Sequence, residues 1–184
     1  EVVLARARIT LRFPSNFLLA AAMNPCPCGL FGDGTDRCTC DPGLILRYRG
    51  RVSGPLLDRI DLHIPVERVP FEAMEGGGGK VESPAIRERV GKARELQTHR
   101  FRGRGIHANG QMGPSDIRQW CRASREVARL LQRALDQLGL SARAYHRILK
   151  VARTIADLEG AREIQSLHVA EAIQYRGLDR RDPL

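Results

Sequence analysis

Residues 16–40 read NFLLAAAMNPCPCGLFGDGTDRCTC, and this stretch decides how the rest of the chain is interpreted. The continuous apolar run Phe17–Met23 predicts a short strand that is covered on both faces. Asn24 lies where that strand ends, which is the edge at which α/β sheets present their chemistry. Pro25 has no N–H to donate to a ladder, so we expect the chain to leave the sheet there.

Four cysteines follow at once as two Cys-x-Cys pairs, Cys26 with Cys28 and Cys38 with Cys40, separated by nine residues. Four thiols that converge across a loop rich in Gly and Asp suit a tetrahedral zinc ion, and four thiolates leave no open position for catalysis. Disulfides and simple buried thiols are the alternatives, and Cys-x-Cys is tighter than the two-residue gap of common zinc fingers. The sequence therefore predicts structural Zn²⁺, which holds a loop with too little apolar content to fold alone.

The chain has 184 residues, is 42% hydrophobic and carries a net charge of +9. It is long enough for one large or two small domains, and without a membrane-length apolar run we expect a soluble, cytoplasmic protein with no membrane partner. Residues 1–83 hold ten cationic and ten anionic side chains, whereas residues 84–184 hold twenty and eleven. The basic second half favours a polyanion such as nucleic acid, and a solvated basic surface explains the charge equally well.

Periodicity divides the chain into an α/β part at residues 1–68, a linker at 69–83 containing four consecutive glycines, and a helical part at 84–184. In the first part we expect a half-exposed strand or hairpin at Val2–Phe13, helical turns at 44–60 and a final strand at Asp61–Val66. In the last part we expect helices at 84–101, 115–122, 124–138, 141–158 and from Ser166 onward.

Three strings carry a resemblance: NPCPCG at 24–29, GPLLDRIDLH at 54–63 and YHRILKVARTIADL at 145–158. Together they resemble the Mg-chelatase-like AAA+ ATPases, and within them the ComM/YifB branch. The resemblance implies the C-terminal strands of an AAA+ core with a zinc-binding loop insertion, followed by a helical lid bundle.

The resemblance also implies roles for two residues of the first part. Asn24 matches sensor 1, and an amide can both donate to a phosphate and accept from water; an Asn-Pro turn without a ligand is the alternative. Arg59 matches the arginine finger, which stabilises charge on the γ-phosphate held by a neighbouring subunit. Its alternative is an internal ion pair with Asp58 or Asp61.

Arg143 matches sensor 2, just after the predicted cap Ser141. A cation in the first turn of a helix opposes the helix dipole, so its position indicates an anionic partner or plain solvent exposure. Arg147 and Arg153, on nearby turns, rank below it.

The Walker A and Walker B motifs of the family are absent from this chain, so we expect no hydrolysis by the chain alone. The resemblance implies ATP and Mg²⁺ as cofactors of a full-length protein that forms a ring, a hexamer, and drives DNA translocation or branch migration in natural transformation. Arg100, Arg102 and Arg104 are the expected DNA contacts.

Two other functions remain open. One is an ATP-driven remodelling subunit for metal insertion, as in magnesium chelatase, although the chelatase subunit lacks the four cysteines. The other is a zinc-bearing DNA-binding module with no nucleotide role.

Overall fold

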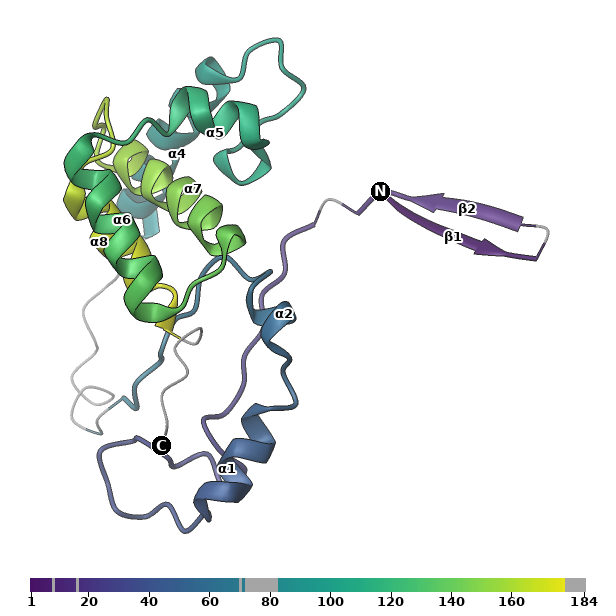
Figure 1. Ribbon diagram of the computed structural model, residues 1–184, viewed down its shortest axis with the longest axis vertical. Coiled ribbons are helices and arrows are strands. Elements are labelled where there is room, and N and C mark those ends of the chain that lie inside the picture. Colours follow the sequence, from purple (N-terminus) through teal and green to yellow (C-terminus); the bar gives the residue numbers. More distant parts are fainter. Residues whose placement is uncertain (8, 16, 70, 72–82, 178–184) are drawn as a thin grey trace. The chain divides into compact units, whose positions relative to one another are not determined.

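The computed structural model describes residues 1–7, 9–15, 17–69, 71 and 83–177, and it divides into two compact units, Glu1–Arg49 and Gly50–Leu184 (Figure 1). Segment 50–68, which the sequence pattern groups with the α/β part, belongs to the unit that holds the helices. Residues 72–82, which hold the predicted glycine linker, lie outside the described residues.

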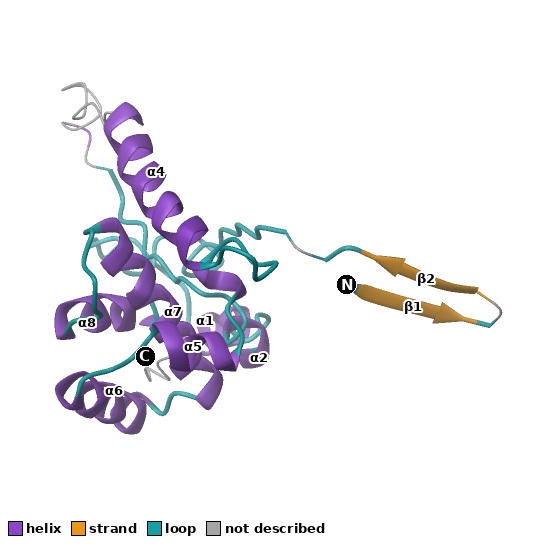
Figure 2. Ribbon diagram, turned by 90° about the horizontal axis from the view of Figure 1, so that it is seen from above, coloured by secondary structure: helices purple, strands orange, loops and turns teal. Residues whose placement is uncertain are grey.

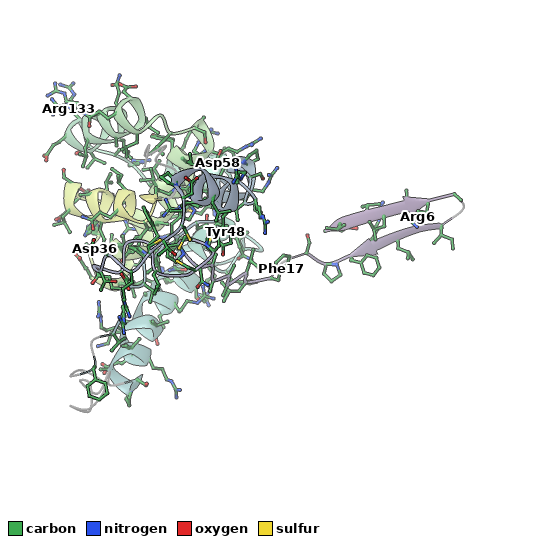
Figure 3. All side chains as sticks on the ribbon, turned by 90° about the horizontal axis from the view of Figure 1, so that it is seen from below. Arg6, Phe17, Asp36, Tyr48, Asp58 and Arg133 are labelled. Carbon is green, nitrogen blue, oxygen red and sulfur yellow. The ribbon has the colours of Figure 1, made fainter. Side chains whose placement is uncertain are left out.

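The first unit opens with a β-hairpin, as the alternating pattern predicts. Strands β1 (Val2–Arg6) and β2 (Ile9–Phe13) pair antiparallel, with Val2 opposite Phe13 and Arg6 opposite Ile9 (Figure 2). The hairpin is more exposed to solvent than the predicted half-exposed element, since every residue of both strands is exposed. Figure 3 shows these side chains, Arg6 among them, standing out from both faces of the hairpin.

The predicted strands at 17–23 and 61–66 are wrong for the described residues. Neither segment joins a ladder there, and Leu18, in the run that should be covered on both faces, is 95% exposed. An apolar run indicates that its side chains favour burial. A strand, however, forms only where a neighbouring strand offers its N–H and C=O groups. Among the described residues only β1 and β2 offer them to each other.

Helix α1 (Pro42–Arg49) closes the first unit and contacts the cysteine loop. The Asp41 carboxylate accepts from the backbone N–H groups of Gly43 (2.8 Å) and Leu44 (3.3 Å), which caps the helix start. At the other end, Arg49 donates from Nε to the Pro25 carbonyl at 3.0 Å and lies over the Phe31 ring at 5.0 Å.

The second unit is a helical bundle, in which helices α4 to α8 pack against one another (Figure 1). Its elements are α2 (Gly54–Leu57), α4 (Ser83–Arg100), the 3₁₀ turn η1 (Asn109–Gln111), α5 (Pro114–Trp120), α6 (Arg125–Leu138), α7 (Ala142–Leu158) and α8 (Ser166–Gln174). The five long helices confirm the helical interpretation of the second half. None of the helices in the described residues is long and apolar enough to cross a membrane.

Local cap residues define several helix ends, among them the predicted cap Ser141. The Ser124 and Ser141 hydroxyls each accept a backbone N–H of the first turn, from Val127 and Ala144, at 3.2 Å. Gly139 ends α6 with a φ of +60°, a conformation that glycine adopts without strain. Helix α8 begins at Ser166, as predicted; Gln165 is its N-cap, and the Ser166 hydroxyl donates to Glu126.

Helix α7 is the centre of the bundle, and its apolar face packs on α4, α5 and α8. Cys121 belongs to this core, and burial raises the pKa of its thiol to about 12. The most deeply buried apolar side chains are Val127, Leu131, Ile148, Leu149 and Val169.

A buried polar cluster joins α4, η1 and α7. The Asp157 carboxylate accepts from both terminal nitrogens of Arg100 (2.7 and 2.5 Å) and from Arg153 Nε at 3.1 Å. It also accepts from the Asn109 amide at 2.8 Å. Its side chain is completely buried, so one carboxylate neutralises two guanidiniums that are largely removed from water.

Replacing Asp157 with Ala should lower the free energy of unfolding of the chain by about 3–5 kcal/mol, because two buried cations lose their counter-ion. Urea denaturation measures the change. Asp136→Ala, on the exposed face of α6, is the matched control and should stay within about 0.5 kcal/mol. A loss below about 1 kcal/mol for Asp157→Ala would mean that the arginines reach solvent without cost.

Candidate functional site

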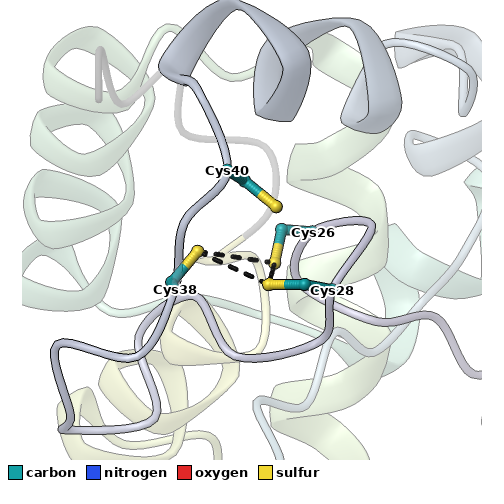
Figure 4. A group of neighbouring side chains, drawn as sticks. All are labelled: Cys26, Cys28, Cys38 and Cys40. Atoms are coloured by element: carbon teal, nitrogen blue, oxygen red, sulfur yellow. Dashed lines mark hydrogen bonds between the residues drawn. The ribbon is translucent and has the colours of Figure 1, made fainter.

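The four predicted metal ligands meet in the first unit, as Figure 4 shows. The Sγ atoms of Cys26, Cys28, Cys38 and Cys40 all lie within 4.8 Å of one another. The Cys26–Cys28, Cys26–Cys38 and Cys28–Cys38 separations are 3.3, 3.8 and 3.7 Å. A tetrahedron with Zn–S bonds of about 2.3 Å has S···S edges of about 3.8 Å, so the cluster has the size of a metal site.

The thiols are free rather than paired in disulfides. Their closest separation exceeds an S–S bond of about 2.05 Å by more than an ångström. The disulfide interpretation therefore does not describe this structure, and the donor set fits a metal ion that prefers thiolates.

The electrostatics of the cluster favour the thiolate of Cys26 and oppose those of Cys38 and Cys40. Burial is the largest single influence on Cys26 and raises its pKa, but hydrogen bonds from Cys28, the Phe31 N–H, Cys38 and the Gly29 N–H together lower it to about 6. For Cys40 the Cys28 N–H favours the thiolate, yet the neighbouring thiols, burial and the Cys26 charge raise its pKa to about 12. A negative charge on one sulfur thus disfavours ionisation of the neighbouring thiols, and a bound cation would relieve the repulsion between thiolates.

Short-range polar contacts, rather than a core, shape the loop between the two cysteine pairs. The Gly29 N–H donates to the Cys26 carbonyl at 3.0 Å in a turn that uses a φ of +82° at Gly29. Further along, Asp33 accepts from the Thr35 hydroxyl at 2.6 Å and from Arg37 at 3.0 Å. A loop held only by such short-range contacts would gain rigidity from a metal ion bound to its four sulfurs.

Asn24 is exposed and lies beside this loop. A Cβ placed on Gly29 would come within 3.7 Å of the Asn24 side chain, so the amide sits over the first turn of the cysteine loop. Because Asn24 is exposed, its side chain is accessible to a group from outside the described residues.

Arg59 is also exposed, and its NH1 donates to the Pro55 carbonyl at 2.8 Å, back along α2. The two acids that would neutralise it are held by other cations. Asp58 lies 3.6 Å from Arg176, and Asp61 pairs with Arg147. The guanidinium of Arg59 therefore keeps its charge available for an external anion.

The three arginines of α7 occupy different environments. Arg143 is exposed in the first turn, Arg147 is partly covered in its pair with Asp61, and Arg153 is buried. Arg153 also donates to the carbonyls of Ala161 and Arg162, so it holds the end of α7 in place. Of the three, Arg143 is the one that can bind an incoming anion without breaking an ion pair.

The three arginines expected on DNA are not equivalent either. Arg100 is held in the buried pair with Asp157, and Arg104 pairs with Asp116 at 2.9 Å and donates to Gln119. Arg102 is exposed, and its side chain makes no hydrogen bond or ion pair within the described part of the chain.

Sequence reasoning missed the partners of these cations. The Arg153–Asp157 pair has the i, i+4 spacing that a helix brings together, so that signal was present. Arg100 and Asp157 are 57 residues apart, and Arg176 reaches back 118 residues to Asp58; no local pattern marks either pair.

These features define a largely helical protein with few strands and a cysteine cluster that can hold a metal ion. Residues 80–176 match the family described as "Magnesium chelatase, subunit ChlI C-terminal", and residues 1–74 match "Magnesium chelatase, subunit ChlI". The chain belongs to this Mg-chelatase-like family, which confirms the resemblance seen in its motifs.

Relatives of the ComM/YifB type align over nearly the whole chain. Competence protein ComM of Haemophilus influenzae is 44% identical over 181 residues, which are 98% of this chain and 34% of that protein. The uncharacterized proteins YifB of Salmonella typhimurium and Escherichia coli are each 40% identical over 181 residues, 98% of this chain and 35% of theirs. The chain spans about a third of the length of these relatives.

Proposed function

We propose that this chain is the C-terminal part of an AAA+ ATPase and contributes Asn24, Arg59 and Arg143 to ATP hydrolysis in a ring of subunits. The observation that carries the proposal is the state of Arg59. Its guanidinium is exposed while Asp58 and Asp61, the acids on either side, are paired with cations of the helical bundle. A cation kept apart from its own neighbouring acids suits an anion on another molecule.

The exposed apolar run at 17–23 supports the same proposal. Leu18 is 95% exposed and Phe17 75%, and runs of exposed apolar side chains mark surfaces that another segment covers. The relatives are about three times as long as this chain. We therefore assign the covering strands, together with the groups that hold ATP and Mg²⁺, to the remainder of a longer protein.

The three groups would act on different parts of the reaction. The Asn24 amide would accept from the attacking water while donating to a phosphate oxygen. The Arg59 guanidinium would neutralise charge as the bond to the γ-phosphoryl group breaks, without itself transferring a proton. Arg143 would bind a phosphate of the nucleotide held by its own subunit, and its two-pronged fork favours that geometry over a lysine.

Zn²⁺ would be structural in this arrangement. Cys26, Cys28, Cys38 and Cys40 would fill its four positions, so the ion would fix the loop beside Asn24 and leave no coordination site for a substrate.

DNA is the proposed substrate of the motor, and its translocation or branch migration the proposed work. The basic second half of the chain and its similarity to a protein named for competence support this choice. The family description, which names magnesium chelatase, favours a second candidate, an ATP-driven subunit of a metal-insertion complex.

ATP hydrolysis by the full-length protein tests the proposal. Hydrolysis that depends on Arg59 and on Arg143 supports an ATPase, and stimulation by DNA then separates the motor from the metal-insertion subunit. If Arg59→Ala and Arg143→Ala both keep the parental rate, a zinc-bearing module without a nucleotide role is the better description.

Arg102 should contribute more to DNA binding than its neighbours Arg100 and Arg104, because it alone of the three is not held by a carboxylate. Arg102 lines a shallow depression at the end of α4, together with Arg94, Glu95, Thr98 and His99. Arg102→Ala in the full-length protein should weaken DNA binding at every sequence and reduce the slope of log K against log salt by about 0.7–0.9, the loss of one phosphate contact.

The measurement is a salt titration of DNA binding by fluorescence anisotropy. Arg133→Ala, on the exposed surface of α6 (Figure 3), removes the same charge elsewhere and should change the slope less. Equal effects of the two variants would indicate a diffuse attraction rather than a contact at Arg102.

A further inference from the structure

The segment that carries Arg59 is fastened to the helical bundle at both ends of the Asp58–His63 stretch. At its start, Asp58 lies 3.6 Å from Arg176, just beyond α8. At its end, the His63 N–H donates to the Tyr175 carbonyl at 2.8 Å. The turn that presents Arg59 is therefore attached to the C-terminal end of α8 before and after the arginine.

Arg176 makes the buried attachment between the Asp58–His63 stretch and the bundle. Its side chain is 1% exposed, and it also donates to the Ile60 carbonyl. A guanidinium buried to this degree needs each of its partners, since a lost hydrogen bond cannot be replaced by water. Asp58 and the Ile60 carbonyl flank Arg59 in the sequence, so burial of Arg176 fixes the backbone on either side of it.

Arg147 makes a second attachment, at the surface, and it connects the same segment to α7. Arg147 pairs with Asp61, and both side chains are partly exposed. Arg147 lies four residues after Arg143, one helical turn further along, so the two arginines project from neighbouring turns of one face of α7. The Arg147–Asp61 pair thus connects the part of α7 that carries Arg143 to the segment of Arg59.

We propose that Asp58 and Asp61 are positioning residues, which fasten Arg59 to the bundle so that the bundle and the finger move as one body. This inference rests on the proposed function of Arg59 and Arg143. Arg143 would sense the nucleotide of its own subunit, whereas Arg59 would act on the nucleotide of the next. A rigid connection between them makes the position of one subunit's bundle set the reactivity of its neighbour's site.

Charge exchange in the Arg147–Asp61 pair gives the decisive experiment, because that pair lies at the surface and tolerates substitution. In the full-length protein, Arg147→Asp and Asp61→Arg should each lower kcat for ATP hydrolysis by about 10–100-fold, the cost of a small misplacement of a reacting group. KM for ATP should stay within about twofold, since the finger stabilises charge that develops in the transition state rather than the bound ATP itself. The double variant, which restores the pair with reversed charges, should recover most of kcat.

Hydrogen exchange supplies a readout independent of hydrolysis. The amide of His63 should exchange more rapidly in each single variant and return towards the parental rate in the double variant. Arg133→Glu reverses a charge on the exposed surface of α6 and should change neither kcat nor this exchange rate. Arg176→Lys, which keeps the charge but loses the fork, should lower kcat in the same way.

The outcomes separate the two claims. If Arg59→Ala abolishes hydrolysis but the single variants keep the parental kcat, the fastening plays no part and this inference is overturned while the proposed function stands. If the single variants lose activity and the double variant does not regain it, Arg147 acts directly rather than through Asp61, which also overturns the inference. If Arg59→Ala hydrolyses ATP at the parental rate, the proposed function itself fails.

Discussion

Arg59→Ala is expected to lower kcat of ATP hydrolysis by the full-length protein by about 10³-fold or more, the range found when an arginine finger is removed. The expectation follows from where the chain places the charge. Arg59 is exposed, donates only to the Pro55 carbonyl within the described residues, and has both adjacent acids withdrawn by other cations. Its removal should therefore cost the fold little and the reaction much.

Two comparisons make the result specific. Arg59→Lys keeps the charge but not the planar fork, so it should recover only part of the loss. Arg51→Ala removes an exposed arginine eight residues earlier and should leave kcat unchanged. The thermal unfolding midpoint of all three variants should match that of the parent protein, which separates a kinetic effect from a folding one.

Mixing experiments test whether the finger acts on a neighbouring subunit. Arg59→Ala subunits keep an intact nucleotide site but no finger, whereas subunits disabled in nucleotide binding keep the finger. Mixed rings of the two inactive proteins should regain hydrolysis, because some interfaces combine the intact half of each. Full activity of Arg59→Ala alone would show that no guanidinium is needed from this position.

Helix α7 shows how much of the fold the sequence could predict. Ser141 caps it, its apolar residues recur at helical spacing, and Gly160 follows its end, so local chemistry and periodicity agree along Ala142–Leu158. The same agreement held for α6. The four cysteines were equally predictable as a cluster, because ligand type and spacing are local properties.

The errors have a single physical origin. Phe17–Met23 and Asp61–Val66 were assigned as strands on side-chain pattern alone, but a strand depends on a partner that the pattern does not contain. In the second case, the backbone N–H of His63 bonds to the Tyr175 carbonyl, more than a hundred residues away, instead of to another strand. The partner of Arg100 shows the same limit, because Asp157 lies 57 residues away on another helix and no local pattern marks the pair.

Loss of the metal is the second large effect, and it should be measurable on this chain. We expect the chain to hold about one equivalent of zinc, and the double variant Cys26→Ser/Cys28→Ser to hold less than about a tenth, because two sulfurs alone do not complete a tetrahedral site. Structural zinc sites contribute about 10–16 kcal/mol in isolated peptides, which exceeds the net stability of most domains. The loop that contains these residues should therefore lose its fixed structure with the ion.

Cys121→Ser is the matched control. Cys121 is a buried thiol in the helical core and is not one of the four clustered cysteines, so its replacement should destabilise the bundle without changing the metal content. Metal analysis after purification in zinc-containing buffer, paired with limited proteolysis at residues 26–40, measures both consequences. Equal metal content in the two cysteine variants would mean that the cluster is not the binding site.

The pH dependence of metal binding follows from the state of the sulfurs. A metal ion binds thiolates, so protons compete with it, and affinity should fall as the pH is lowered. The thiols differ in the cluster without metal, since the pKa of Cys26 is lowered to about 6 while that of Cys40 is raised to about 12. Metal uptake at neutral pH should therefore release protons, chiefly from the sulfurs whose pKa is raised. Uptake without proton release would argue that fewer than four thiols bind the ion.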